Sequence, residues 1–144
     1  MSKPANPVET TDTLQDQAIQ RSNTDNAPRS AIHQTLYSAD TFVQHDYLAG
    51  KNLPDIVRPQ EGQINWLHFV GINDVTLLKH ALEPYGIHEL VIEDILSRKQ
   101  RPKIEDYGSY VFTAAQVYHY TSTGKLHSDQ VYVIIGKDFV LSFQ

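Results

Sequence analysis

Residues 87–107 read IHELVIEDILSRKQRPKIEDY, a run in which an apolar helical pattern passes directly into a cluster of basic residues. At about 100° per residue, the apolar side chains of its first half gather on one side of a helical wheel. These side chains are Ile87, Leu90, Val91 and Ile95. The pattern predicts a helix from about residue 88 to residue 96, which has ended by Pro102.

Asp94 stands on or beside the apolar face of this predicted helix, whereas Glu93 falls on the solvent side. A carboxylate near apolar surface needs a partner, because burying an unpaired charge costs free energy. One candidate is a structural ion pair with Arg101 or another member of the basic run. That run comprises Arg98, Lys99, Arg101 and Lys103. The other candidate is a hard divalent cation bound by Glu93 and Asp94, with further oxygen ligands from another chain or a later segment.

Strand-like segments precede and follow this stretch, and a second helical segment lies directly before it. Strands are predicted over residues 31–38, 41–47, 64–70, 109–120, 127–135 and 139–143, the last three as a meander. A second helix is predicted after Asn73, which can cap it, and Pro84 and Gly86 close it. This order predicts an α/β (mixed α+β) fold in which helices cover a mixed, partly antiparallel sheet.

The composition of the chain argues against several classes of function. The chain has 144 residues, and its 12 Lys and Arg against 17 Asp and Glu give a formal net charge of -5, which argues against broad binding to phosphate backbones. The absence of cysteine excludes a disulfide framework and a thiol nucleophile. No run approaches the roughly 18 apolar residues that cross a bilayer, and the N-terminus lacks a secretory pattern. We therefore expect no nucleic-acid partner, no membrane span and a cytoplasmic compartment.

Residues 1–30 differ in composition from the rest of the chain. They contain three prolines and many small polar residues, and every aromatic residue lies from Tyr37 onward. Such a segment cannot bury enough apolar surface to offset the entropy of ordering. We expect a disordered polar tail over residues 1–30, followed by one domain over residues 31–144.

The familiar catalytic motifs are missing. His88 and Glu89 begin like the helix of a zinc protease, but Ile92 stands where the second histidine belongs. The sequence also has no phosphate-binding loop, no nucleophile elbow and no dinucleotide fingerprint. Its seven histidines are scattered singly along the chain rather than clustered. We therefore expect no enzymatic activity and predict no histidine metal site.

Four segments in order carry a family resemblance. They are WLHFVGI (66–72), GIHELVIEDIL (86–96), RPKIEDYGSYVF (101–112) and DQVYVIIGKDFVLSFQ (129–144). From about residue 64 to residue 144 the chain resembles the N-terminal cytoplasmic domain of the CorA family of magnesium and cobalt transporters. Glu89 replaces the proline of a His-Pro-Leu tripeptide common in that family, and both residues suit the first turn of a helix. Residues 31–63 match loosely, and residues 1–30 do not match.

The resemblance implies an α/β/α cytoplasmic domain, with the sheet sandwiched by helices, in a homopentamer. Family members continue into a stalk helix and two transmembrane helices, so we expect the chain to be truncated before these segments. The full-length protein would then place this domain at the cytoplasmic side of the inner membrane. Two alternatives stay open, the cytoplasmic domain of a ZntB-type zinc transporter and a free-standing soluble interaction domain.

The resemblance also assigns a regulatory role to the two acids of the helix. It implies that Glu93 and Asp94 contribute to regulatory sites for Mg²⁺, or for Co²⁺ and other divalent cations, between subunits. Asp94 would face an acid on the stalk helix of a neighbouring subunit. A cation bound there would offset the repulsion between the carboxylates and hold the transporter closed.

Overall fold

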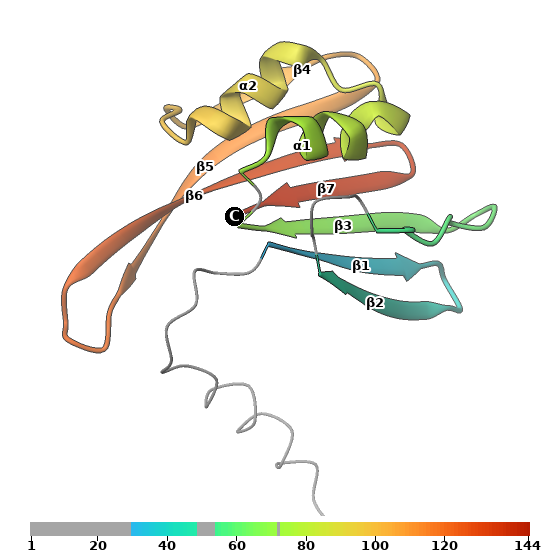
Figure 1. Cartoon of the computed structure of the whole chain (residues 1–144), viewed down its shortest axis with the longest axis horizontal. Helices are drawn as coiled ribbons and strands as arrows, with labels where there is room; N and C mark the ends of the chain where they lie inside the picture. The colour runs from blue at the N-terminus through green and yellow to red at the C-terminus, as the bar shows by residue number, and fades with distance from the viewer. Residues whose placement is uncertain (1–29, 49–53, 72) are drawn as a thin grey trace, which may run out of the picture.

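The computed structural model describes residues 30–48, 54–71 and 73–144, so residues 1–29 of the predicted tail lie outside the described residues. Figure 1 shows a single curved sheet with two helices on one side. The elements in chain order are β1 (Ala31–Tyr37), β2 (Phe42–Leu48), β3 (Ile64–Val70), α1 (Val75–Leu82), the 3-10 turn η1 (Glu83–Tyr85), α2 (Glu89–Ser97), β4 (Lys103–Asp106), β5 (Tyr110–Tyr120), β6 (Leu126–Gly136) and β7 (Phe139–Phe143). Both predicted helices and all six predicted strands are present, and β4 is an additional strand.

The seven strands form one sheet in the order β2-β1-β3-β7-β6-β5-β4. Strands β3 and β7 pair in parallel at its centre, and every other pairing is antiparallel. The predicted mixed, partly antiparallel sheet is therefore confirmed. A parallel pair needs a crossover, and here the crossover contains both helices and strands β4 to β6.

One face of the sheet holds the core. Alternate strand residues point to this face, and Phe112, Ile134 and Leu141 have no exposed surface there. Helices α1 and α2 cover the same face (Figure 1), and Leu82 and Val91 bring their side chains into the core with no exposed surface. Burial of one apolar stripe on each short helix therefore fixes both helices against the sheet.

The opposite face of the sheet carries no helix within the described ranges. Trp66 and Ile135 lie on this face and are 43% and 51% exposed. The indole of Trp66 donates a hydrogen bond to Ser142 Oγ at 2.9 Å. In the part of the chain that the structure describes, the helical cover is therefore one-sided.

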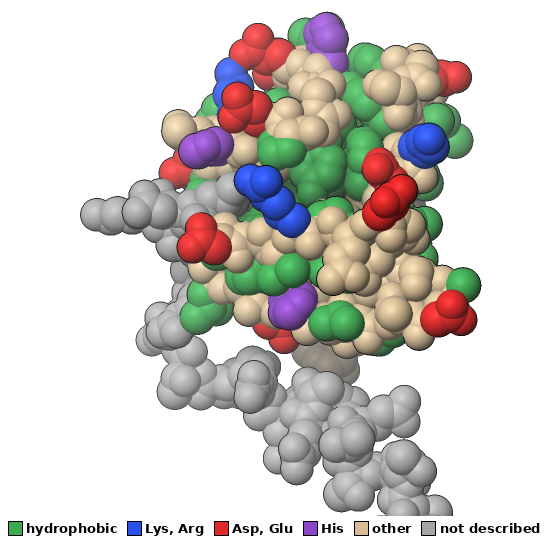
Figure 2. All heavy atoms as spheres, turned by 90° about the vertical axis from the view of Figure 1, so that its right-hand side faces the viewer, with side chains coloured by type: hydrophobic (Ala, Val, Ile, Leu, Met, Phe, Trp, Pro, Cys, Tyr) green, Lys and Arg blue, Asp and Glu red, His purple; other side chains and the backbone are tan. Residues whose placement is uncertain are grey.

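Charge on the surface is mixed in sign. On the side of the molecule drawn in Figure 2, Lys and Arg side chains stand singly among acidic and apolar ones. A phosphate backbone is bound by a continuous basic surface. The side shown in Figure 2 does not provide one.

The cap of helix α1 corrects one prediction. Asp74, and not Asn73, is the N-cap residue, and its Oδ1 accepts hydrogen bonds from the backbone N–H groups of Thr76 at 2.8 Å and Leu77 at 2.9 Å. Either residue type can cap a helix, but Asp74 directly precedes the first helical residue. Its charge also interacts favourably with the positive end of the helix dipole. At the other end, α1 stops at Leu82 and the 3-10 turn η1 follows, so Gly86, which was predicted to close the helix, closes this turn instead at a φ of 62°.

Replacing Asp74 by Ala is expected to lower the free energy of unfolding by about 1 kcal/mol, because two first-turn N–H groups lose their acceptor. Chemical denaturation followed by circular dichroism measures this loss. Asn73→Ala, one residue upstream, is the matched control and should change stability by less than about 0.5 kcal/mol. Equal losses for the two variants would contradict the assignment of Asp74 as the cap.

Candidate functional site

Helix α2 positions the predicted acidic site. His88 is its N-cap, and His88 Nδ1 accepts a hydrogen bond from the backbone N–H of Leu90 at 3.2 Å. The backbone N–H of His88 donates to the hydroxyl of Tyr110 on β5 at 2.9 Å. The start of α2 is thereby tied to strand β5 of the sheet.

The buried face of α2 is rotated from the predicted one. Val91, Ile92 and Ile95 are buried, whereas Leu90 is 58% exposed. The prediction of Leu90 as a core residue is therefore wrong, because α2 packs on the sheet through the side of the wheel that contains Ile92. Asp94 lies at the edge of this face, as predicted, with a side chain that is 21% exposed.

Both carboxylate oxygens of Asp94 have donors. Lys103 Nζ donates to Oδ2 at 2.7 Å, and Gln100 Nε2 donates to Oδ1 at 2.7 Å. The partner is thus a member of the predicted basic run, but it is Lys103 and not Arg101, which is exposed. The reason is strand β4, in which Lys103 points its side chain back toward α2.

Lys103 is shared between two carboxylates. Its Nζ also donates to Glu105 Oε2 at 3.0 Å, and the hydroxyl of Tyr107 donates to the same oxygen at 3.2 Å. The hydrogen bond to Asp94 raises the pKa of Lys103, and the hydrogen bond from Lys103 lowers the pKa of Glu105. We call Asp94, Lys103 and Glu105 the Lys103 cluster. It contains two negative charges and one positive charge, so it retains an excess negative charge.

Glu93 stands apart from this cluster. Its side chain is exposed, and it forms no ion pair within the described residues. Adjacent helical residues point about 100° apart, so Glu93 and Asp94 do not converge on one point by themselves. A cation held by both would need further oxygen ligands from outside the described residues.

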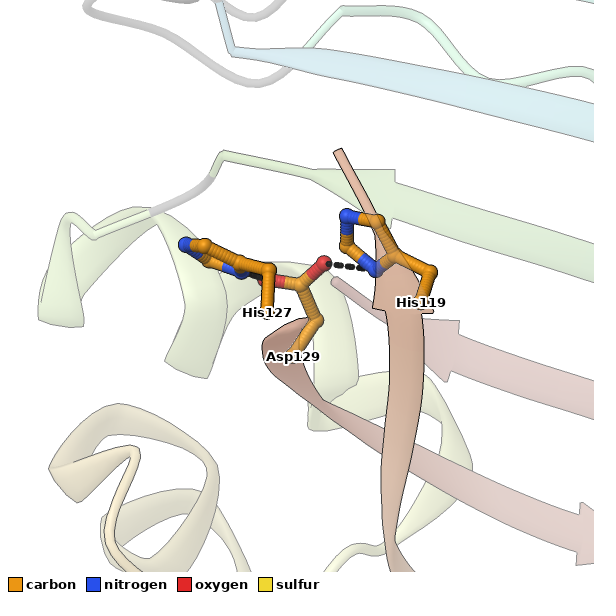
Figure 3. Close-up of side chains that lie close together, drawn as sticks. All are labelled: His119, His127 and Asp129. Carbon is orange, nitrogen blue, oxygen red and sulfur yellow. Dashed lines mark ion pairs between the residues drawn. The ribbon is translucent and has the colours of Figure 1, made fainter. Parts of the chain in front are cut away.

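A second cluster was missed by the sequence analysis. His119 and His127 lie beside Asp129 at the end of the β5–β6 hairpin, and their potential ligand atoms all lie within 4.8 Å of one another (Figure 3). The interpretation of the histidines as isolated is therefore wrong for these two. The sequence did contain a signal, since His119 and His127 are equidistant from the centre of the turn after Tyr120, and a hairpin pairs such positions.

None of the helices in the described part of the chain is long and apolar enough to span a membrane.

Comparison with known proteins finds matches over more than half of the chain. Residues 61–144 match the family model described as CorA-like Mg²⁺ transporter protein. The chain is 40% identical over 80 residues to the Cobalt/magnesium transport protein CorA of Thermotoga maritima, covering 55% of this chain and 23% of that protein. It is 33% identical over 107 residues to the Putative metal ion transporter YfjQ of Bacillus subtilis, covering 72% of this chain and 31% of that protein. The chain thus spans less than a third of the length of either relative.

Solved structures share the fold at low sequence identity. The complete CorA magnesium transporter of Methanocaldococcus jannaschii superposes with a TM-score of 0.54 at 10% identity, covering 83% of this chain and 33% of that one. The soluble domain of the same transporter gives 0.55 at 12% identity, covering 78% and 39%. The full-length CmaX protein gives 0.56 at 15% identity, covering 83% and 36%. These likenesses concern the fold alone, and they extend over more of the chain than the family match does.

Proposed function

The chain belongs to the family of CorA-like Mg²⁺ transporter proteins, and we propose that it is the cation-responsive cytoplasmic domain of a transporter for Mg²⁺ or Co²⁺. In this proposal, Asp94 and Glu93 bind a regulatory Mg²⁺ between the subunits of a homopentamer. The observation that carries the proposal is the Lys103 cluster, in which a partly buried carboxylate on α2 is held by an ammonium group that already has a second partner.

The cluster allows Asp94 to exchange one cation for another. Lys103 lies between Asp94 and Glu105, at 2.7 Å and 3.0 Å from their carboxylate oxygens. If Mg²⁺ took the place of the ammonium group at Asp94, Lys103 would keep its ion pair with Glu105. The exchange therefore leaves no charge unpaired. An unpaired charge is the main cost of breaking a partly buried ion pair. Mg²⁺ keeps several of its waters, so its contact with Asp94 and Glu93 can be partly water-mediated.

An exposed apolar side chain on α2 supports the proposal of a subunit contact beside these acids. Leu90 is 58% exposed and lies one turn before both Glu93, which is exposed, and Asp94, which lies at the edge of the buried face, so an exposed apolar side chain stands between the two acids. An apolar centre with a polar rim is the usual composition of a protein interface. Carboxylates of two subunits that approach here would repel each other, and a bound Mg²⁺ would remove that repulsion.

We expect Asp94→Asn in the full-length transporter to raise the Mg²⁺ concentration that half-inhibits transport by about tenfold or more, which corresponds to about 1.4 kcal/mol of lost coupling. Lys103→Gln should act in the opposite direction and lower that concentration, because it removes the ammonium group that competes with Mg²⁺. Cation uptake into proteoliposomes, measured separately with Mg²⁺, Co²⁺ and Zn²⁺, gives the inhibition curve and identifies the cation that is transported.

The opposite directions of the two expected shifts in the half-inhibiting Mg²⁺ concentration distinguish a regulatory role of Asp94 from a structural one. Asp94→Asn and Lys103→Gln break the same ion pair, so a purely structural pair would make the two variants behave alike. Glu89→Gln is the matched control, because it removes one negative charge from the same helix at a residue that pairs with Lys79 instead. Shifts of the same sign for the first two variants, or an equal shift for Glu89→Gln, would refute the proposal.

A further inference from the structure

We propose that His119, His127 and Asp129 form a binding site for a divalent transition-metal ion such as Zn²⁺ at the end of the β5–β6 hairpin. This site has no residue in common with the Lys103 cluster.

Strand register places the three side chains together. Strands β5 and β6 pair antiparallel from Tyr110 to Tyr120, with His119 opposite His127 and Val117 opposite Asp129. Side chains two residues apart in a strand share a face, so His127 and Asp129 point the same way, and His119 joins them from across the ladder. Figure 3 shows the two imidazole rings on either side of the Asp129 carboxylate.

The turn holds this arrangement. The backbone N–H of Thr121 donates to Lys125 O at 2.8 Å, and the N–H of Gly124 donates to Thr121 O at 2.8 Å. Gly124 has a φ of 76°, a left-handed conformation that glycine adopts without steric cost. The end of the hairpin is thus a closed turn. His119 and His127 form the second-last residue pair of the strand ladder before this turn.

The distances suit a single ion. His119 Nδ1 lies 3.5 Å from Asp129 Oδ2, and His127 Nδ1 lies 3.5 Å from Asp129 Oδ1. In a tetrahedral zinc site with bonds of about 2.0–2.1 Å, neighbouring ligand atoms are about 3.3 Å apart. The potential ligand atoms of the three side chains all lie within 4.8 Å of one another, and the two imidazole ring centroids are 5.4 Å apart.

The ligand types indicate the class of metal ion that the site would bind. Two imidazole nitrogens and one carboxylate oxygen suit Zn²⁺, Co²⁺, Ni²⁺ or Cu²⁺, whereas Mg²⁺ prefers an octahedron of oxygens that includes several waters. Three protein ligands leave one position of a tetrahedron for water. The side chains of His119, His127 and Asp129 are 49%, 59% and 40% exposed, so an ion can reach them from solvent.

Zinc titration of the untagged 144-residue chain by isothermal calorimetry, after treatment with a chelator, tests the site. We expect one Zn²⁺ per chain, and we expect His119→Ala, His127→Ala and Asp129→Asn each to weaken binding by at least tenfold. Co²⁺ serves as a second probe, because tetrahedral coordination gives intense visible absorption bands that octahedral coordination does not. A millimolar excess of Mg²⁺ should leave the zinc isotherm unchanged.

His80→Ala is the matched control, since His80 is an exposed histidine on α1 outside the cluster. It should bind zinc as the unchanged chain does. All three cluster side chains are partly exposed, and circular dichroism will show that the variants keep the fold. Zinc binding that is absent, that survives replacement of both histidines, or that is lost equally in His80→Ala would overturn the proposal. None of these outcomes bears on inhibition of transport by Mg²⁺.

Discussion

Replacement of Phe112 by Ala is expected to lower the free energy of unfolding by about 3–5 kcal/mol, the range for removing a large aromatic side chain from a core. Phe112 lies on β5 with no exposed surface, and its ring stacks on Tyr132 with centroids 6.1 Å apart. The ammonium group of Lys103 lies 5.4 Å from the centre of the same ring. The substitution therefore removes a core contact and a support of the Lys103 cluster at once.

Denaturation with urea, followed by tryptophan fluorescence and circular dichroism, measures this loss as a lower midpoint. Val111→Ala is the matched control, because Val111 is the adjacent residue on the opposite face of β5 and is 36% exposed. It should lose less than about 1.5 kcal/mol, as expected for a partly exposed valine. Losses of equal size would contradict the placement of the core on the helix-covered face alone.

Replacement of Gln34 by Leu is expected to lower the free energy of unfolding by about 2 kcal/mol, because it leaves buried polar groups without partners. Gln34 is 1% exposed, and its Nε2 donates to Asn65 Oδ1 at 2.9 Å and to Val57 O at 2.8 Å. Its Oε1 accepts from the hydroxyl of Tyr47 at 2.9 Å. Leucine fills a similar volume but satisfies none of these groups.

The loss should be concentrated in the segment around Val57, which Gln34 and Tyr47 hold to the sheet. Hydrogen exchange of the backbone amide of Val57 should therefore accelerate together with the global destabilisation. Gln44→Leu on β2 is the matched control, since Gln44 is exposed and makes only a 3.5 Å contact with Thr35. A Gln34→Leu variant as stable as Gln44→Leu would show that the buried amide is not needed.

Most elements of the fold were predictable because their signals are local. The apolar spacing around Val91 predicted α2, and the run from Val131 to Ile135 predicted β6. Strand β4 was missed because it has only four residues, reads KIED and lies at the edge of the sheet. Its one large apolar side chain, Ile104, is 75% exposed, so no buried apolar residue marks this strand in the sequence.

The sequence by itself determined the family, the order of the elements and the position of Asp94 at the edge of the apolar face, since each follows from local spacing or from contiguous motifs. Only the tertiary structure decided which side chains from different elements meet. Lys103 reaches Asp94 because β4 pairs with β5 beneath α2, and His119 meets Asp129 because of the β5–β6 register. A helical wheel describes one element at a time. A site between elements depends on how strands pair and on which face of a helix packs against the sheet. Those choices are set by burial summed over the whole core.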